Sequence, residues 1–229
     1  MRAHLLRIGA VAGVLGATAQ LIAGAVETDW GGPPTKAVAR VASNSYFTAD
    51  RLLDLVGVFL TFLMLAVVAS TLRTSDTHGW AAVSEPFLAL WGAVGAAAIL
   101  VGASMKDAAD AWQQNSAGAR TAYLATFDVT ARVTEALFFG AFVAIGMYLA
   151  CLAGAILSSS VYPRPTGWAM IVISALLIFG NLLSLLVEAA FLLVLLGLVG
   201  FAGLLGALAV ALWRQAQISV PVSAAAHPL

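Results

Sequence analysis

Long apolar segments separated by polar stretches dominate this chain. The apolar runs lie near residues 5–26, 51–72, 86–104, 131–157 and 167–212. A helix needs about 20 residues, at 1.5 Å each, to cross a hydrocarbon core of about 30 Å. The runs reach or exceed that size and lack the period-two alternation of barrel strands. Each therefore predicts at least one membrane-spanning helix.

The last apolar run is about twice as long as one span. It holds a single charged residue, Glu188, near its middle. Two helices that turn at 187–190 would bring this carboxylate to a helix end, where it can reach water. The sequence thus predicts an all-α fold with six transmembrane helices, near 5–26, 51–72, 86–104, 131–157, 167–187 and 189–212.

The remaining stretches are read as connections. These helices would form one membrane domain over residues 1–214, and residues 215–229 are expected to be a disordered tail. Loop one (27–50) contains a segment, 35–41, that could form a short surface helix. Loop three (105–130) is polar but rich in alanine, so we expect it to be partly helical.

Composition supports a membrane protein and excludes several other classes. The chain is 62% hydrophobic and 10% charged, with a mean hydropathy of +0.97, whereas a soluble domain is about half apolar and a quarter charged. The formal net charge is zero and the cations are scattered, so nothing indicates a nucleic-acid partner. The single cysteine, Cys151, excludes an internal disulfide and a cysteine metal cluster.

Motifs of the common enzyme classes are missing from the sequence. It contains no nucleophile elbow, zinc-protease helix, P-loop or dinucleotide fingerprint. The histidines His4, His78 and His227 lie at the termini or in a loop, where they could not ligate a membrane haem. We therefore expect a non-enzymatic protein with no cofactor and no metal.

Ionisable residues gather at one end of the predicted bundle. Asp54, Glu135 and Glu188 each lie at or just inside the end of an apolar segment. Because successive spans alternate in direction, these ends share one side of the membrane. Cations and an amide join them, which gives a candidate ligand site made of Arg51, Asp54, Arg132, Glu135, Asn181, Glu188, Lys106 and Asp107.

Two interpretations of these residues remain open. In the first, they line an outward-opening pocket that binds a small polar ligand or ion, with Asn181 as its floor. In the second, interfacial salt bridges fix the helix ends, and loops one and three contact a membrane partner or a second copy of the chain. A small-solute transporter is less favoured, because the inner halves of the second, fourth and sixth spans carry almost nothing polar. Asn181 lies deepest, so we expect it to hydrogen-bond to another helix.

Basic residues near the span ends bear on orientation. Arg2, Arg7, Arg73, Arg164 and Arg214 lie close to span ends on the side that carries both termini. Cytoplasmic loops are enriched in such residues, so both termini are predicted to lie in the cytoplasm and the bundle in the cell membrane. Trp80, Trp168 and Trp213 would then anchor the inner interface.

The overall layout resembles the six-span integral-membrane proteins of actinobacteria that form the unknown-function family numbered 4386. The likeness rests on an arginine-flanked, Gly/Ala-rich first helix, on Asp50-Arg51-Leu52-Leu53-Asp54 at the entry to the second, and on Met105-Lys106-Asp107 at the exit from the third. It covers most of the chain through short motifs. It implies a bacterial membrane protein and carries over no functional residue.

Overall fold

Long α-helices make up nearly all of the structure. The computed structural model describes residues 2–26, 32–73 and 78–218. Within these, the long helices are α1 (Arg2–Val26), α3 (Phe47–Leu72), α4 (His78–Gln114), α5 (Ala117–Leu157), α6 (Arg164–Ser184) and α7 (Phe191–Ile218). All six are long and apolar enough to cross a membrane. The all-α fold with six candidate spans is confirmed.

Two short helices complete the described chain. Most of the long helices extend beyond the expected spans at one end or both. α2 (Pro34–Ser43) occupies the place of the expected short helix in loop one, and the 3-10 helix η1 (Glu188–Ala190) lies between α6 and α7. α4 begins eight residues before the expected 86, and α7 continues past the expected end at 212 to Ile218. Residues 219–229 of the expected tail lie outside the described residues.

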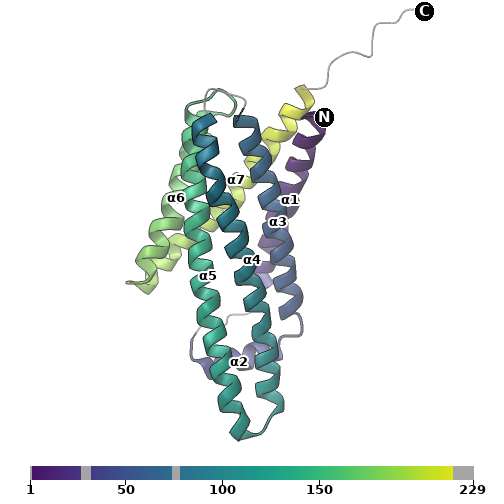
Figure 1. Cartoon of the computed structure of the whole chain (residues 1–229), viewed down its shortest axis with the longest axis vertical. Helices are drawn as coiled ribbons and strands as arrows, with labels where there is room; N and C mark the ends of the chain where they lie inside the picture. Colours follow the sequence, from purple (N-terminus) through teal and green to yellow (C-terminus); the bar gives the residue numbers. More distant parts are fainter. Residues whose placement is uncertain (1, 27–31, 74–77, 219–229) are drawn as a thin grey trace, which may run out of the picture.

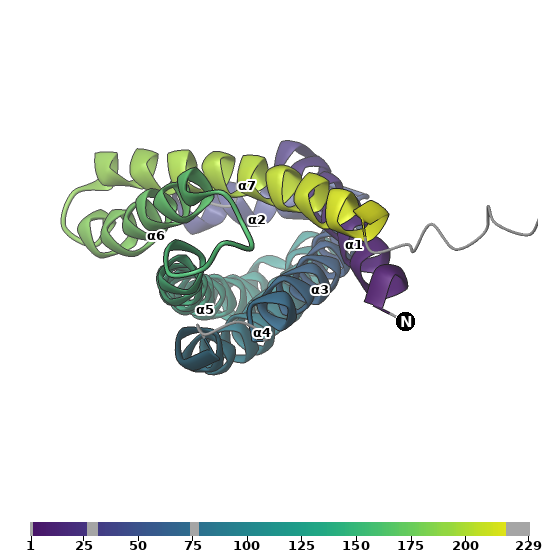
Figure 2. The same ribbon diagram turned by 90° about the horizontal axis from the view of Figure 1, so that it is seen from above.

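The six long helices form a ring in chain order. α1 packs on α3, α3 on α4, α4 on α5, α5 on α6 and α6 on α7, and α7 returns to α1. Figure 1 shows α1 and α7 meeting near the top, where the first helix begins and the last one ends. Figure 2, seen from above, shows α6 and α7 in one row and α3, α4 and α5 in another. We call the end with Arg2 and Ile218 the terminal end, and the opposite one the distal end.

Small residues allow the closest helix contacts. A Cβ added to Gly16 of α1 would lie 2.9 Å from the backbone nitrogen of Thr61 and 3.1 Å from the carbonyl oxygen of Gly57, both on α3. Only glycine permits two backbones to approach this closely, which is a common way for helices to associate in lipid. The crossing of α1 and α3 is therefore fixed by backbone contact.

The main hydrophobic core lies toward the terminal end and contains few polar contacts. Tyr148 of α5 is fully buried and donates a hydrogen bond of 2.9 Å to the carbonyl oxygen of Leu65 on α3. Thr71 and Tyr162 share a further hydrogen bond of 2.9 Å near the connection between α5 and α6. The hydroxyls of Tyr148, Thr71 and Tyr162 are thus paired between neighbouring elements.

Tryptophans at the terminal end indicate where the bilayer begins. Trp80, Trp168 and Trp213 are 53%, 61% and 44% exposed, as expected for an aromatic belt at an interface. About 20 residues from Trp80, the length of one span, lead to about residue 100 of α4. However, α4 has 37 residues and α5 has 41. Their distal parts therefore continue beyond the hydrocarbon.

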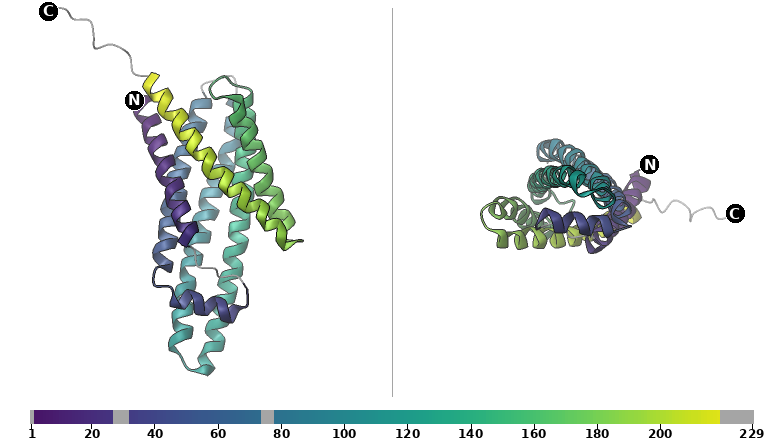
Figure 3. Two further views of the ribbon diagram at one scale, coloured as in Figure 1. Left: turned by 180° about the vertical axis from the view of Figure 1, so that it is seen from behind. Right: turned by 90° about the horizontal axis from the view of Figure 1, so that it is seen from below.

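This extension is a helical hairpin over residues 105–130, which we call the distal hairpin. In Figure 1 it projects below the ends of the other spans, and α2 lies across it. Figure 3 shows the same projection from behind, with α7 running diagonally from α1 toward α6. Loop three, expected to be partly helical, is helical except around residues 115 and 116.

Candidate functional site

A second, smaller hydrophobic cluster lies at the distal end and is built around α2. The short helix begins with Pro34, which suits the first helical position because it needs no backbone donor there. Its apolar residues at 37, 38, 41 and 42 fall on one face. That face packs against α3, α4 and α5 in a group that we call the distal cluster: Ala37, Val38, Val41, Ala42, Phe47, Met105, Ala108, Ala109 and Phe127.

Charged residues of α3 lie between the distal cluster and the main core. Arg51 is 3% exposed and Asp50 is 8% exposed, and Asp54 is partly buried one turn further on. All three have interaction partners. On the same face as Arg51, Phe47 belongs to the distal cluster and Val58 to the main core. We call Asp50, Arg51 and Asp54 the polar layer.

Arg51 is held against an aromatic ring. Its guanidinium carbon lies 5.1 Å from the centroid of the Phe47 ring, within the range of a cation–π contact. The ring of Phe47 is itself fully buried in the distal cluster. The residues Phe47 and Arg51 are four apart on one helix, so their contact follows directly from helical geometry.

Lys106 connects α4 to the end of α2. Its Nζ donates hydrogen bonds to the carbonyl oxygens of Ala42, at 2.8 Å, and Val41, at 3.3 Å. It also forms an ion pair of 2.8 Å with Asp110, one turn further along α4. A cation at these carbonyls satisfies acceptors that a helix leaves open at its C-terminus and complements the helix dipole. Asp107, next in sequence, is exposed.

The predicted site residues of α5 lie on the surface. Arg132 donates a hydrogen bond of 3.1 Å to Asp128 of the same helix, and its side chain is 75% exposed. Glu135 is also exposed. Their neighbour Thr134 is fully buried, and its methyl group lies against Gly102 of α4. Arg132 is thus paired along its own helix.

Asn181 is buried but makes its hydrogen bond locally. Its Nδ2 donates to the carbonyl oxygen of Leu177 at 2.7 Å, one turn back on α6. The expected hydrogen bond to another helix is therefore wrong, because the amide returns to its own backbone as short polar side chains often do. Glu188 begins η1, and its side chain lies outside the described part of the structure.

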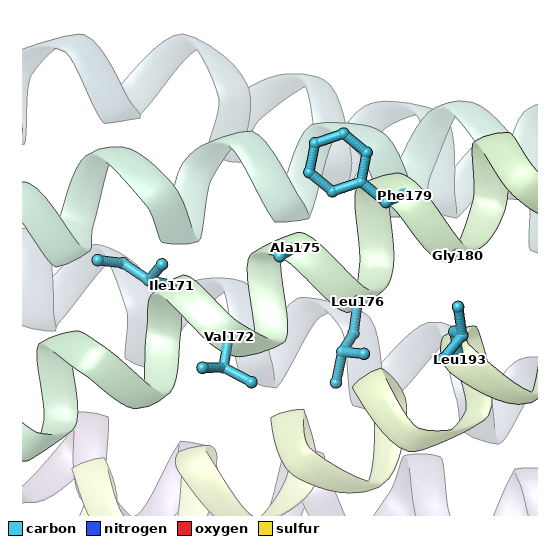
Figure 4. Close-up of a pocket in the computed structure, with 7 residues that line it drawn as sticks. All are labelled: Ile171, Val172, Ala175, Leu176, Phe179, Gly180 and Leu193. Atoms are coloured by element: carbon cyan, nitrogen blue, oxygen red, sulfur yellow. The ribbon is translucent and has the colours of Figure 1, made fainter.

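Two surface hollows occur on the α6–α7 side, away from the polar layer. The larger, about 370 Å³, is shown in Figure 4 and is lined only by apolar residues: Ile171, Val172, Ala175, Leu176, Phe179, Gly180 and Leu193. The other, about 310 Å³, lies between the start of α6 and the middle of α7 and includes Thr166 and Gly203. Neither contains a predicted site residue.

The structure therefore separates the predicted residues. A first group lies at the distal end, with Arg51 and Asp54 near the start of α3 and Lys106 bonded to α2. Asp107, Arg132 and Glu135 are exposed, and Asn181 is buried in α6. Sequence reasoning missed two residues that complete the first group: Phe47 beneath Arg51 and Asp110 beside Lys106. Each is four residues from its partner, so the i,i+4 spacing could have identified both. Among the residues described, no three His, Cys, Asp or Glu side chains lie close enough to hold a metal ion.

Comparison with known proteins returns no relative. No family model, no curated protein and no solved structure matches this chain. The resemblance to the unknown-function family numbered 4386 and the bacterial origin that it implies have no support from these comparisons. A multi-pass membrane protein with six candidate spans is the identification that stands.

Proposed function

We propose that the polar layer binds a small polar or charged solute, which reaches it from the distal side of the membrane. The protein would then be a non-enzymatic binding protein of the cell membrane, with the distal end outside. The observation that carries this proposal is the burial of Arg51, 3% exposed, between two hydrophobic clusters.

The depth of Arg51 makes its burial informative. Val58 lies beside Gly95 of α4, so Arg51, seven residues nearer the distal end of α3, is level with about residue 102 of α4. That level is about 33 Å from Trp80 at 1.5 Å per residue, where the hydrocarbon ends. An ionisable residue that a membrane protein keeps buried at such a place usually serves a function.

A purely structural role would not require this burial. The pair of Arg132 and Asp128, at the same end of the bundle, shows that an exposed ion pair can mark a helix end in this protein. Exposed pairs contribute about 0–1 kcal/mol, whereas removing charges from water costs several kcal/mol for each ion. A binding function would explain why the protein buries Arg51 despite this cost.

The charges of the layer define the class of solute. A guanidinium matches a carboxylate or phosphate through two parallel hydrogen bonds, and the carboxylates of Asp50 and Asp54 suit an ammonium group or another cation. Cation and anion sites within one helical turn complement a small solute that carries both charges. We therefore propose a zwitterion as the preferred ligand, ahead of a simple ion.

The proposal is tested by thermal melts of the detergent-solubilised protein with a panel of amino acids, small carboxylates, amines and salts. A solute at 100 times its Kd adds about 2.7 kcal/mol of stability, which appears as a rise in Tm. We expect Asp54→Asn to abolish that rise and Asp107→Asn, an exposed control, to retain it. The double variant Asp54→Asn with Glu135→Gln should melt normally without solute. A loss of several degrees would instead indicate a structural salt-bridge network.

A second candidate function rests on the distal hairpin. α4 and α5 continue past the ends of the other spans as a helical pair, and Arg120 ties their turn to the end of α4. Such a projection suits a membrane subunit that contacts a partner or a second copy. A photoreactive residue in place of Thr121, exposed on the hairpin, would then give one discrete adduct in native membranes. The same residue in place of Gln217, at the terminal end, would give none. Equal results at both sites would remove this candidate.

A further inference from the structure

We propose that α2 is a hinged cover over the polar layer, and that Lys106 is the latch that holds it closed. The purpose of the cover, to control when a solute reaches Arg51 and Asp54, rests on the proposed function. The movement itself follows from how α2 is attached to the rest of the protein.

α2 is attached by little apolar surface. It has ten residues, and its buried side chains are two alanines and two valines: Ala37, Val38, Val41 and Ala42. A helix this short is marginal on its own, so its position depends on the contacts that it makes. Those contacts belong to the distal cluster, which is separate from the main core. Displacing α2 would therefore leave the packing of the six spans in place.

The short link between α2 and α3 is built as a turn. Asn44 donates its backbone N–H to the carbonyl oxygen of Val41, and its side-chain oxygen accepts a hydrogen bond of 2.8 Å from the N–H of Tyr46. α3 then begins at Phe47. α2 would swing about this turn, which lies a few residues before the polar layer on α3.

The latch is the set of contacts made by Lys106. Its Nζ bonds two backbone carbonyls at the C-terminal end of α2, so it holds the helix itself rather than any one side chain. The third partner, Asp110, keeps the ammonium group in place from its own helix. The side chain of Lys106 is still 16% exposed, so water or an arriving solute can compete at its edge.

The cover is continuous with the polar layer. Phe47 links the two, because its ring belongs to the distal cluster together with four residues of α2 and also lies 5.1 Å from the guanidinium carbon of Arg51. Removal of α2 would uncover Phe47 and give Arg51 and Asp54 access to water. With α2 in place, Arg51 is only 3% exposed.

Cysteine accessibility in the full-length protein in membranes tests the inference. Val38→Cys reports the buried face of α2, and Phe47→Cys, in the distal cluster beside Arg51, reports the layer. Each is combined with Lys106→Met, Lys106→Arg or the exposed control Lys36→Met, and labelled with a water-soluble maleimide. We expect Lys106→Met to raise both labelling rates about tenfold. Lys106→Arg and Lys36→Met should leave them low, because arginine retains the charge and the donors.

The native Cys151, 8% exposed in the main core, reports whether the whole bundle loosens. Faster labelling of Val38→Cys without faster labelling of Phe47→Cys would show that α2 detaches without uncovering the layer, and would overturn the proposal. Unchanged rates at both positions, or faster labelling of Cys151 in the Lys106→Met protein, would overturn it too. No solute is present in the assay, so its failure leaves the proposed binding function untouched, and a failed solute screen leaves the cover untouched.

Discussion

Arg51 and Arg132 open two similar sequence motifs, yet the structure holds them in opposite ways. Each is followed three residues later by an acid, Asp54 or Glu135. Arg51 lies on Phe47 between two hydrophobic clusters and is 3% exposed, whereas the side chain of Arg132 is 75% exposed. The difference arises from the neighbours. α3 begins beneath α2, whereas this part of α5 lies beyond the end of α6, which otherwise packs against it.

A single glycine decides how closely α1 and α3 can pack. We expect Gly16→Ala to lower the free energy of unfolding by about 1–3 kcal/mol, because the new methyl group would meet the backbone of Thr61 and Gly57 as well as the Thr61 hydroxyl. Gly24→Ala on the same helix meets nothing within 4 Å. This control should be neutral or gain up to about 1 kcal/mol. Melts of both variants in one detergent provide the comparison, and equal losses would contradict the close crossing.

The Tyr162 hydroxyl, in the connection at the terminal end, predicts a dependence on pH. Burial raises the pKa of Tyr162 from its ordinary value of 10.0 to about 12. The folded protein thus holds the phenol proton more tightly than the unfolded chain. The stability that this contributes is full below pH 10 and is lost as the pH rises through about 12.

Tyr162→Phe should separate this contribution from other titrations. At pH 9 we expect the variant to be about 1 kcal/mol less stable than the parent, because it loses the hydrogen bond with Thr71. From pH 9 to pH 11 the parent should lose roughly 1 kcal/mol more than the variant, so the two melting temperatures converge. Parallel falls in Tm would show that the phenol is not protected in the folded state.

The sequence could predict where charges occur along the helices, but not which of them become buried. Asp128 and Arg132 have the i,i+4 spacing of an ion pair within one helix, and the structure has that pair. Arg51 lies on Phe47, which packs in one cluster with α2 and with residues 105, 108, 109 and 127, far away in sequence. Asn181 was misjudged for a local reason: its amide donates to the carbonyl of Leu177, one turn back on its own helix. Hydropathy predicts neither the long-range packing of helices nor which nearby acceptor a polar side chain chooses.

At the scale of elements, the distal hairpin is the feature that hydropathy describes least well. Residues 105–130 are too polar for a membrane span, so from the sequence they were assigned to a loop that is only partly helical. Their alanines favour helix without adding hydrophobicity, and both helices continue to the turn around residues 115 and 116. Span prediction therefore located the membrane segments while missing the length of the helices that contain them.

Arg120 fastens the tip of that hairpin. Its Nε donates hydrogen bonds of 3.1 Å to the carbonyl oxygens of Trp112 and Asn115, and its guanidinium lies over the Trp112 ring at 5.2 Å. We expect Arg120→Ala to free the end of α4, so that limited proteolysis cuts near 113–118 several times faster at an unchanged Tm. Arg132→Ala, which removes an exposed pair worth about 0.3–0.5 kcal/mol, is the matched control. Equal cutting of both variants would show that Arg120 does not hold the turn.

At the scale of the whole molecule, the ring has two unlike ends. The terminal end is closed by the packed core and the tryptophan belt, whereas the distal end carries α2, the polar layer and the hairpin. An even number of spans places both chain termini on one side. A solute, a partner or a moving cover would all act at the distal end, so the orientation of the protein decides which compartment it serves.

Orientation can be measured directly, because Cys151 is the chain's one cysteine and is buried. Arginines near the span ends favour the terminal side in the cytoplasm. Thr35→Cys on α2 and Ser116→Cys at the hairpin turn are both exposed positions, and we expect them to react with an impermeant maleimide in intact cells. Gln217→Cys, exposed at the end of α7, should react only after the cells are opened. The reverse pattern would place the polar layer on the cytoplasmic side, and the solute would then be an intracellular one.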